Sequence, residues 1–168
     1  ETEALSFDDS ETQGLLRRTA AELLAARYPL ARLYALESGK ESLGRSDLEE
    51  VAELGWLALT VPDKAGGGGL TLLEAGVVLE ELGYSGAPLP LAPANAVNGG
   101  LARPGGFAGL SEERRRAGAE LRAESGRLAG RAGLVAGARL AEALLVTVEG
   151  DGSRGLGLIP VSSGRLRP

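Results

Sequence analysis

Residues 54–83 read LGWLALTVPDKAGGGGLTLLEAGVVLEELG, and this stretch carries most of the information about the fold. Its glycine-rich centre joins a compact apolar run, residues 56–61, to a segment whose apolar residues recur at helical spacing. Thr71 and Glu74 form a capping box, in which each side chain satisfies a backbone N–H at the start of a helix. We therefore expect a helix to begin after Thr71 and to close at Gly83.

The chain before this stretch predicts three more helices. Apolar residues on one face, behind capping residues at positions 8–10, predict a helix that ends near Arg27. A short helix is expected over residues 31–37. Ser46 and Glu49 form another capping box and predict a third helix, which Gly55 ends as its C′ residue.

The pattern changes after residue 99. A helix is expected over residues 94–101, followed by a composition break over residues 99–109 and a short polar helix or linker over residues 111–119. Short alternating segments separated by glycine turns then predict an antiparallel meander. The expected strands are residues 120–124, 127–129, 134–136, 143–149 and 156–161.

The predicted fold class is therefore α+β. We expect an N-terminal helical bundle domain over residues 1–104, followed by a reduced antiparallel β-sheet domain over residues 105–168. A chain of 168 residues is long enough to bury a sizeable core.

Composition excludes several classes of function. The net charge is −5 and no long basic run exists, which disfavours nucleic-acid binding. The chain has no cysteine and no histidine, so disulfides, thiolate sites, histidine-based triads and histidine-based zinc sites are excluded. The acidic start lacks the apolar core of a signal peptide, and the apolar runs are too short to span a bilayer. We expect a soluble, cytoplasmic protein that makes no use of a membrane.

Two glycine patterns invite a nucleotide-binding interpretation, and neither is favoured. The glycines at 66–69 follow Lys64 and are not followed by the Lys-Ser/Thr pair of a phosphate loop. Gly130, Gly133 and Gly137 precede a strand-like run, whereas a dinucleotide fingerprint leads into a helix.

The acidic residues indicate no catalytic constellation. Glu80 and Glu81 are adjacent, so on a helix they point about 100° apart and cannot act as a facing pair. They are interpreted as solvated charges on a helix face. The residues themselves therefore predict no catalytic site and no metal site.

The ordered motifs of the first hundred residues resemble the acyl-CoA dehydrogenase family. Leu-Gly-Trp at 54–56, Thr-Val-Pro-Asp at 60–63, the glycines at 66–69 and Glu-Glu-Leu-Gly at 80–83 follow the family's order and approximate spacing. Downstream, residues 124–130 are similar to the strand pair that precedes the family's Gly-x-Lys turn. The resemblance covers nearly the whole chain but only the front part of a typical member.

Family membership implies FAD as cofactor and an acyl-CoA thioester as substrate. A glutamate removes the α proton in such enzymes, and a hydride passes from the β carbon to the flavin. The family commonly places Trp-Ile-Thr against the flavin, and the aligned positions here are Leu134, Val135 and Ala136. These three residues are the cofactor-binding candidates, although they supply neither an aromatic ring nor a hydroxyl.

Other departures shape the functional expectation. The family's Thr-Glu-Pro-x-x-Gly-Ser stretch is missing between residues 93 and 126, and the usual catalytic glutamate lies beyond the aligned region. We expect a chain that serves FAD-linked α,β-desaturation of an acyl-CoA within a larger chain or a heteromeric complex. The resemblance implies a homo- or hetero-oligomer with another dehydrogenase subunit. The alternative is a non-catalytic binding or structural paralogue that kept the scaffold.

Overall fold

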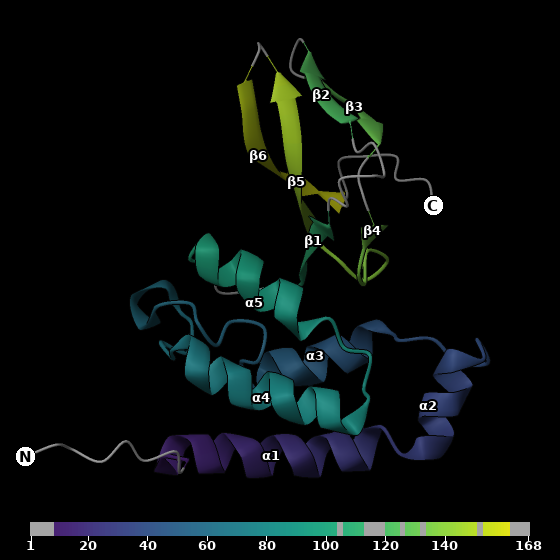
Figure 1. Cartoon of the computed structure of the whole chain (residues 1–168), viewed down its shortest axis with the longest axis vertical. Coiled ribbons are helices and arrows are strands. Elements are labelled where there is room, and N and C mark those ends of the chain that lie inside the picture. The colour runs from purple at the N-terminus through teal and green to yellow at the C-terminus, as the bar shows by residue number, and fades with distance from the viewer. Residues whose placement is uncertain are drawn as a thin grey trace, which may run out of the picture. The chain divides into compact units, whose positions relative to one another are not determined.

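The computed structural model describes residues 9–103, 106–112, 120–124, 127–131, 134–150 and 153–161. Within these ranges, five α-helices and one short 3₁₀ helix precede six strands (Figure 1). The predicted α+β class, helices first and a small β region second, is confirmed. The helices are α1 Glu11–Arg27, α2 Leu30–Glu37, α3 Arg45–Glu53, η1 Asp63–Ala65, α4 Leu72–Ser85 and α5 Leu91–Gly100. The strands are β1 Ala108–Glu112, β2 Glu120–Glu124, β3 Arg127–Arg131, β4 Leu134–Val135, β5 Ala143–Gly150 and β6 Ser153–Pro160.

The chain forms two compact units, each built from separate segments. The first combines the chain up to Leu43 with Leu70–Pro88, and it contains α1, α2 and α4. The second combines Gly44–Gly69 with the chain from Leu89 onward, and it contains α3, α5 and the strands. The expected division into domains at residues 104 and 105 stays a prediction.

Helix α1 begins with reciprocal capping. The Ser10 hydroxyl oxygen accepts a hydrogen bond from the Gln13 backbone N–H (3.2 Å), and the Gln13 side-chain oxygen accepts one from the Ser10 N–H (2.9 Å). This arrangement satisfies two N–H groups that the helix itself leaves unpaired. The helix ends at Arg27, as the sequence predicts.

The start of α3 differs from the prediction. The helix begins after Gly44, whose N–H donates to the Asp47 carboxylate (2.9 Å), so the expected Ser46–Glu49 capping box is wrong. Asp47 stands at the third helical position and accepts from the N-cap N–H, so the helix begins at Arg45 and not after Ser46. The helix end follows the prediction: Gly55 has φ +74° and follows the C-cap Leu54.

Helix α4 begins as predicted and ends later. The Thr71 hydroxyl accepts from the Leu73 N–H (3.2 Å), and the Glu74 carboxylate accepts from the Thr71 N–H (2.9 Å). Gly83 was expected to close the helix, but the helix continues to Ser85. Gly86 adopts φ +71°, and this left-handed position, rather than Gly83, provides the stop.

The core of the second unit contains a buried segment without regular structure. Trp56, Leu57, Ala58, Leu59 and Val61 are all at most 5% exposed. Two side-chain amides of α5 bind the backbone of this segment. Asn95 donates to the Trp56 carbonyl (2.7 Å) and accepts from the Leu59 N–H (3.0 Å). Asn98 donates to the Leu57 carbonyl (2.8 Å), so backbone groups that the core hides from water keep partners.

The sheet is mixed, which corrects the expectation of a purely antiparallel meander. The β2–β3, β5–β6 and β1–β4 pairs are antiparallel. Strand β5 also pairs in parallel with β1 and with β2. Short turns force neighbouring strands to run antiparallel, whereas the long connections from β1 and β2 to β5 permit parallel pairing.

Strand β1 was not predicted. It covers Ala108–Glu112, where the sequence suggested a composition break followed by a polar helix or linker. Residues 113–119, the rest of that expected polar segment, lie outside the described residues. The strand forms because it pairs in parallel with Ala143 to Leu145 of β5. This long-range pairing cannot be predicted from the residues next to β1 in the sequence.

Gly67 of the glycine-rich loop lies so close to Val61 that a side chain at this position has no room. A Cβ there would lie 2.3 Å from the Val61 side chain and carbonyl, whereas a Cβ at Gly76 inside α4 would meet nothing within 4 Å. We expect Gly67→Ala to lower the free energy of unfolding by about 1–3 kcal/mol through overpacking. Gly76→Ala should raise it by about 0.5–1 kcal/mol through helix propensity. Urea denaturation measures both, and equal stability of the two variants would contradict this account.

Candidate functional site

The three cofactor-binding candidates lie consecutively at β4 and the turn after it. Leu134 and Val135 form β4, opposite Glu112 and Ser111 of β1 respectively. Val135 is half-buried, and Ala136 is exposed in the turn. The structure therefore places the candidates in one short segment, with the Ala136 side chain accessible to a ligand.

Val135 is already committed to packing within the sheet. A Cβ at Gly109 would lie 2.6 Å from the Val135 Cγ1 and 3.1 Å from the Leu144 Cδ2, so the valine fills the space beside this glycine. The Val135 carbonyl also accepts a hydrogen bond from the Ala138 N–H (3.3 Å). The segment can offer a ligand aliphatic surface but no side-chain hydrogen bond and no ring. By themselves these residues do not fit a flavin, which needs donors to its ring atoms.

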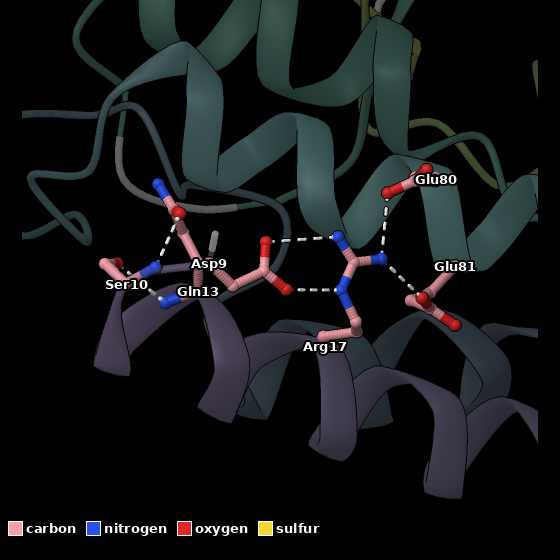
Figure 2. Close-up of polar contacts among 6 residues, drawn as sticks. All are labelled: Asp9, Ser10, Gln13, Arg17, Glu80 and Glu81. Carbon is pink, nitrogen blue, oxygen red and sulfur yellow. Dashed lines mark hydrogen bonds and ion pairs between the residues drawn. The ribbon is translucent and has the colours of Figure 1, made fainter. Parts of the chain in front are cut away.

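A polar cluster joins α1 to α4 in the first unit. Figure 2 shows the Arg17 guanidinium pointing at three carboxylates. Its Nε lies 2.7 Å from Asp9, and its Nη1 lies 2.8 Å from both Glu80 and Glu81. We call these four residues the Arg17 cluster. The side chain of Glu81 is only 15% exposed, so the interpretation of both glutamates as solvated charges is wrong for Glu81; Glu80 remains 65% exposed.

The charges of the cluster stabilise one another. Hydrogen bonds to Asp9, then to Glu80 and Glu81, hold the pKa of Arg17 above its ordinary value. The hydrogen bond from Arg17 likewise lowers the pKa of Asp9. A guanidinium paired in this way stays charged and cannot exchange protons at neutral pH. The Arg17 cluster therefore joins α1 to α4 and is not an acid–base site.

A second polar contact joins the N-terminal ends of the same helices. The buried Gln13 side chain donates to the Glu74 carboxylate (2.9 Å). Hydrogen bonds from the Thr71 hydroxyl, from Gln13 and from the Thr71 backbone lower the pKa of Glu74 to about 2. The Glu74 carboxylate thus caps α4 and holds α1 at once.

Sequence reasoning missed Gln13 and Arg17. Both extend the face of α1 that carries the buried Ala20 and Leu24, at the i, i+4, i+7 and i+11 positions counted from Gln13. Polar residues that continue an apolar helix face were the available signal, because such residues require a polar partner on the packed neighbour.

An open hollow also runs along α2. It is lined mainly by one stripe of that helix, and no residue of the Arg17 cluster lines it. Its lining residues are Ala31, Tyr34, Ala35, Glu37, Ser38 and Lys40. Over the ranges that the structure describes, no three acidic side chains are grouped as a metal site would need. Across the same ranges, every helix is too short or too polar to cross a bilayer.

The chain belongs to the acyl-CoA dehydrogenase family. Residues 10–121 match the family described as acyl-CoA dehydrogenase, N-terminal domain, and this match covers more than half of the chain. The acyl-CoA dehydrogenase FadE12 of Mycobacterium tuberculosis is 33% identical over 96 residues, which are 56% of this chain and 24% of that protein. The acyl-CoA dehydrogenase IpdE2 of the same species is 39% identical over 85 residues, 48% of this chain and 26% of that protein.

Solved structures share the fold over a longer part of the chain. The ChsE4–ChsE5 complex from Mycobacterium tuberculosis matches with a TM-score of 0.70 at 18% identity, covering 93% of this chain and 49% of that chain. A variant of the Tcur3481–Tcur3483 steroid acyl-CoA dehydrogenase matches with a TM-score of 0.70 at 25% identity, covering 89% and 48%. A glutaryl-CoA dehydrogenase from Mycobacterium smegmatis in complex with FADH2 matches with a TM-score of 0.69 at 16% identity, covering 90% and 46%. The chain thus spans about a quarter of these curated relatives and about half of the solved chains.

The contacts of the Arg17 cluster predict a loss of thermal stability when Arg17 is replaced. Arg17→Gln removes the cation to which three carboxylates are bound, so the midpoint of thermal unfolding should fall. Arg18→Gln, which changes an exposed arginine of the same helix, should leave the midpoint where it is. Circular dichroism on heating measures both variants. Equal midpoints for the two variants would show that the cluster contributes nothing.

The lowered pKa of Glu74 predicts an acid limb in the stability curve. The carboxylate is stabilised in the folded state, so its contribution is complete above its ordinary value of 4.5 and is lost as the pH falls toward about 2. Glu74→Gln keeps a side-chain acceptor but cannot titrate, so stability should depend less on pH across this window. The exposed Glu22→Gln variant is the control, and its curve should follow the wild type. Urea unfolding at a series of pH values provides the measurement.

Proposed function

We propose that this chain supplies the helical N-terminal region and part of the β region of an acyl-CoA dehydrogenase. The reaction is FAD-linked α,β-desaturation of an acyl-CoA thioester, carried out within a longer polypeptide or a heteromeric complex. One observation carries the proposal: the family match over residues 10–121 lies within a fold likeness that spans nearly this whole chain. A cytoplasmic location is part of the proposal.

A contribution from further polypeptide is proposed because the described residues offer little for the chemistry. The three cofactor-binding candidates are aliphatic residues: Leu134, Val135 and Ala136. The two carboxylates of the Glu-Glu-Leu-Gly motif, Glu80 and Glu81, are bound by Arg17. The chain would then shape the site, while the flavin contacts and the carboxylate base come from elsewhere. The ChsE4–ChsE5 complex, in which a chain with this fold stands in an assembly of two proteins, supports a heteromeric arrangement with another dehydrogenase subunit.

A non-catalytic paralogue is the second candidate. Residues 134–136 favour this candidate, because Val135 packs within the sheet and none of the three side chains has a group that can hydrogen-bond to a flavin. Such a protein would keep the scaffold for binding or assembly. Titration calorimetry with acyl-CoA thioesters separates the two proposals, because the paralogue should bind none of them, alone or with a candidate partner.

The cofactor proposal is tested by purifying the chain alone and together with the product of the neighbouring gene. We expect the visible absorption of bound flavin in the co-purified sample and not in the chain alone. A sample without partner and without flavin under either condition would count against the enzyme proposal.

A single substitution tests whether β4 faces the flavin in that complex. Ala136→Glu places a carboxylate at the exposed position, and burying an unpaired charge against the flavin should weaken flavin binding on the order of tenfold or more. Ala25→Glu introduces the same charge at an exposed position of α1 and should leave flavin binding unchanged. Fluorescence titration of the apo-complex with FAD measures the dissociation constants. Unaltered binding by Ala136→Glu would remove these positions from the flavin site.

A further inference from the structure

The connection from β4 to β5 is a compact turn that begins with a cofactor-binding candidate. It spans residues 136–142, and Ala136 stands at its start. A hydrogen bond from the Leu140 N–H to the Gly137 carbonyl (2.8 Å) closes the turn internally. Ala136 is exposed, whereas Ala141 near the other end is only 6% exposed. The turn is therefore accessible at Ala136 and packed into the protein at its far end.

Gly137 lies against two buried side chains. A Cβ at this position would lie 2.9 Å from the Phe107 Cε1, 3.0 Å from the Phe107 Cζ and 2.9 Å from the Pro90 Cγ. Phe107 is 2% exposed, and Pro90, the residue before α5, is buried as well. Gly137 also has φ +69°, a conformation that favours glycine. The backbone of the turn thus reaches the tip of the Phe107 ring, and a larger residue at 137 would have to push it away.

Phe107 also holds the end of the same turn through its backbone. Its carbonyl accepts a hydrogen bond from the N–H of Glu142, the residue before β5 (2.8 Å). The ring therefore contacts the turn one residue after Ala136, and the carbonyl binds the turn where it enters β5. Both contacts lie inside the folded chain, and groups that are already buried here stay buried when further polypeptide is added.

We propose that Phe107 is a positioning residue for FAD, which acts through Gly137 on the place of Ala136. The inference rests on the proposed function, with residues 134–136 beside the flavin. Because these residues have aliphatic side chains, what they offer a flavin is close packing rather than hydrogen bonds. A gap of about 0.5–1 Å already removes about a quarter to a half of a dispersion contact. Flavin binding therefore depends on how accurately Phe107 places the turn.

The position of the turn is measured on the full chain without flavin. Because the chain has no cysteine, Ala52→Cys/Ala136→Cys introduces two unique thiols for nitroxide labels, at exposed positions of α3 and of the turn. Both positions belong to the second unit. Pulsed electron paramagnetic resonance should give one narrow distribution of distances. Phe107→Leu removes the ring tip and should broaden the distribution, whereas Gly137→Ala places a methyl group against the ring and should shift its mean. An unchanged distribution in both variants overturns the proposal.

Flavin binding is measured on the co-purified complex without labels. Fluorescence titration of the apo-complex with FAD should show a dissociation constant raised on the order of tenfold for Phe107→Leu and for Gly137→Ala. The control is Val78→Ala, which truncates a 0% exposed side chain of α4 in the first unit. This control should lower the urea midpoint of the chain comparably to Phe107→Leu. It should leave the dissociation constant and the distance distribution unchanged.

The outcomes separate this inference from the proposed function. Wild-type flavin binding by Phe107→Leu, with a broadened distance distribution, overturns the inference and leaves the proposed function intact. An equal loss of binding in Val78→Ala overturns it too, because general destabilisation would then be the cause. A wild-type complex that binds no flavin defeats the proposed function, and the positioning role of Phe107 falls with it.

Discussion

Two amide side chains of α5 hold the part of the chain on which the second unit depends. The segment that contains Trp56, Leu57 and Leu59 is buried without forming a helix or a strand, so its backbone polar groups need partners other than regular structure. Asn95 supplies one donor and one acceptor to it, and Asn98 supplies a donor that also reaches the Gly106 carbonyl. Because Gly106 lies just before β1, the Asn98 amide connects the buried segment to the start of the sheet. An apolar residue at either position would leave these groups buried and unpaired, at a cost of about 1–3 kcal/mol for each group.

In the first unit, carboxylates and an arginine, together with one amide, join the helices. Helices α1 and α4 meet through Gln13 with Glu74 and through Arg17 with Glu80 and Glu81 (Figure 2). Exposed ion pairs contribute little one at a time, but a guanidinium shared by three carboxylates sets the orientation of two helices. The two glutamates that carry part of the resemblance to acyl-CoA dehydrogenases therefore have a structural role in this chain. Their occupation by Arg17 is also the reason that neither is proposed as a base.

The β region has the fold of the family, but the three candidate residues offer few groups that a flavin could bind. Leu134 and Val135 lie on a strand of the sheet, yet the side chain of Val135 is used against Gly109 and that of Ala136 is a methyl group. Binding a flavin ring requires donors that this segment lacks, so the flavin contacts are proposed to come from further polypeptide.

The sequence by itself determined the elements whose hydrogen bonds close within a few residues. The caps at Ser10 and Thr71, the left-handed Gly55 and the hairpins of β2–β3 and β5–β6 are all local, and each was predictable from residue type and spacing. The order of the family motifs likewise predicted the fold class. Only the tertiary structure decided that Arg17 would meet Glu80, 63 positions away, that Asn95 would bind Leu59, 36 positions away, and that β1 would pair in parallel with β5. Such contacts depend on which elements pack together, and this packing cannot be predicted from the type of one residue or from its immediate neighbours in the sequence.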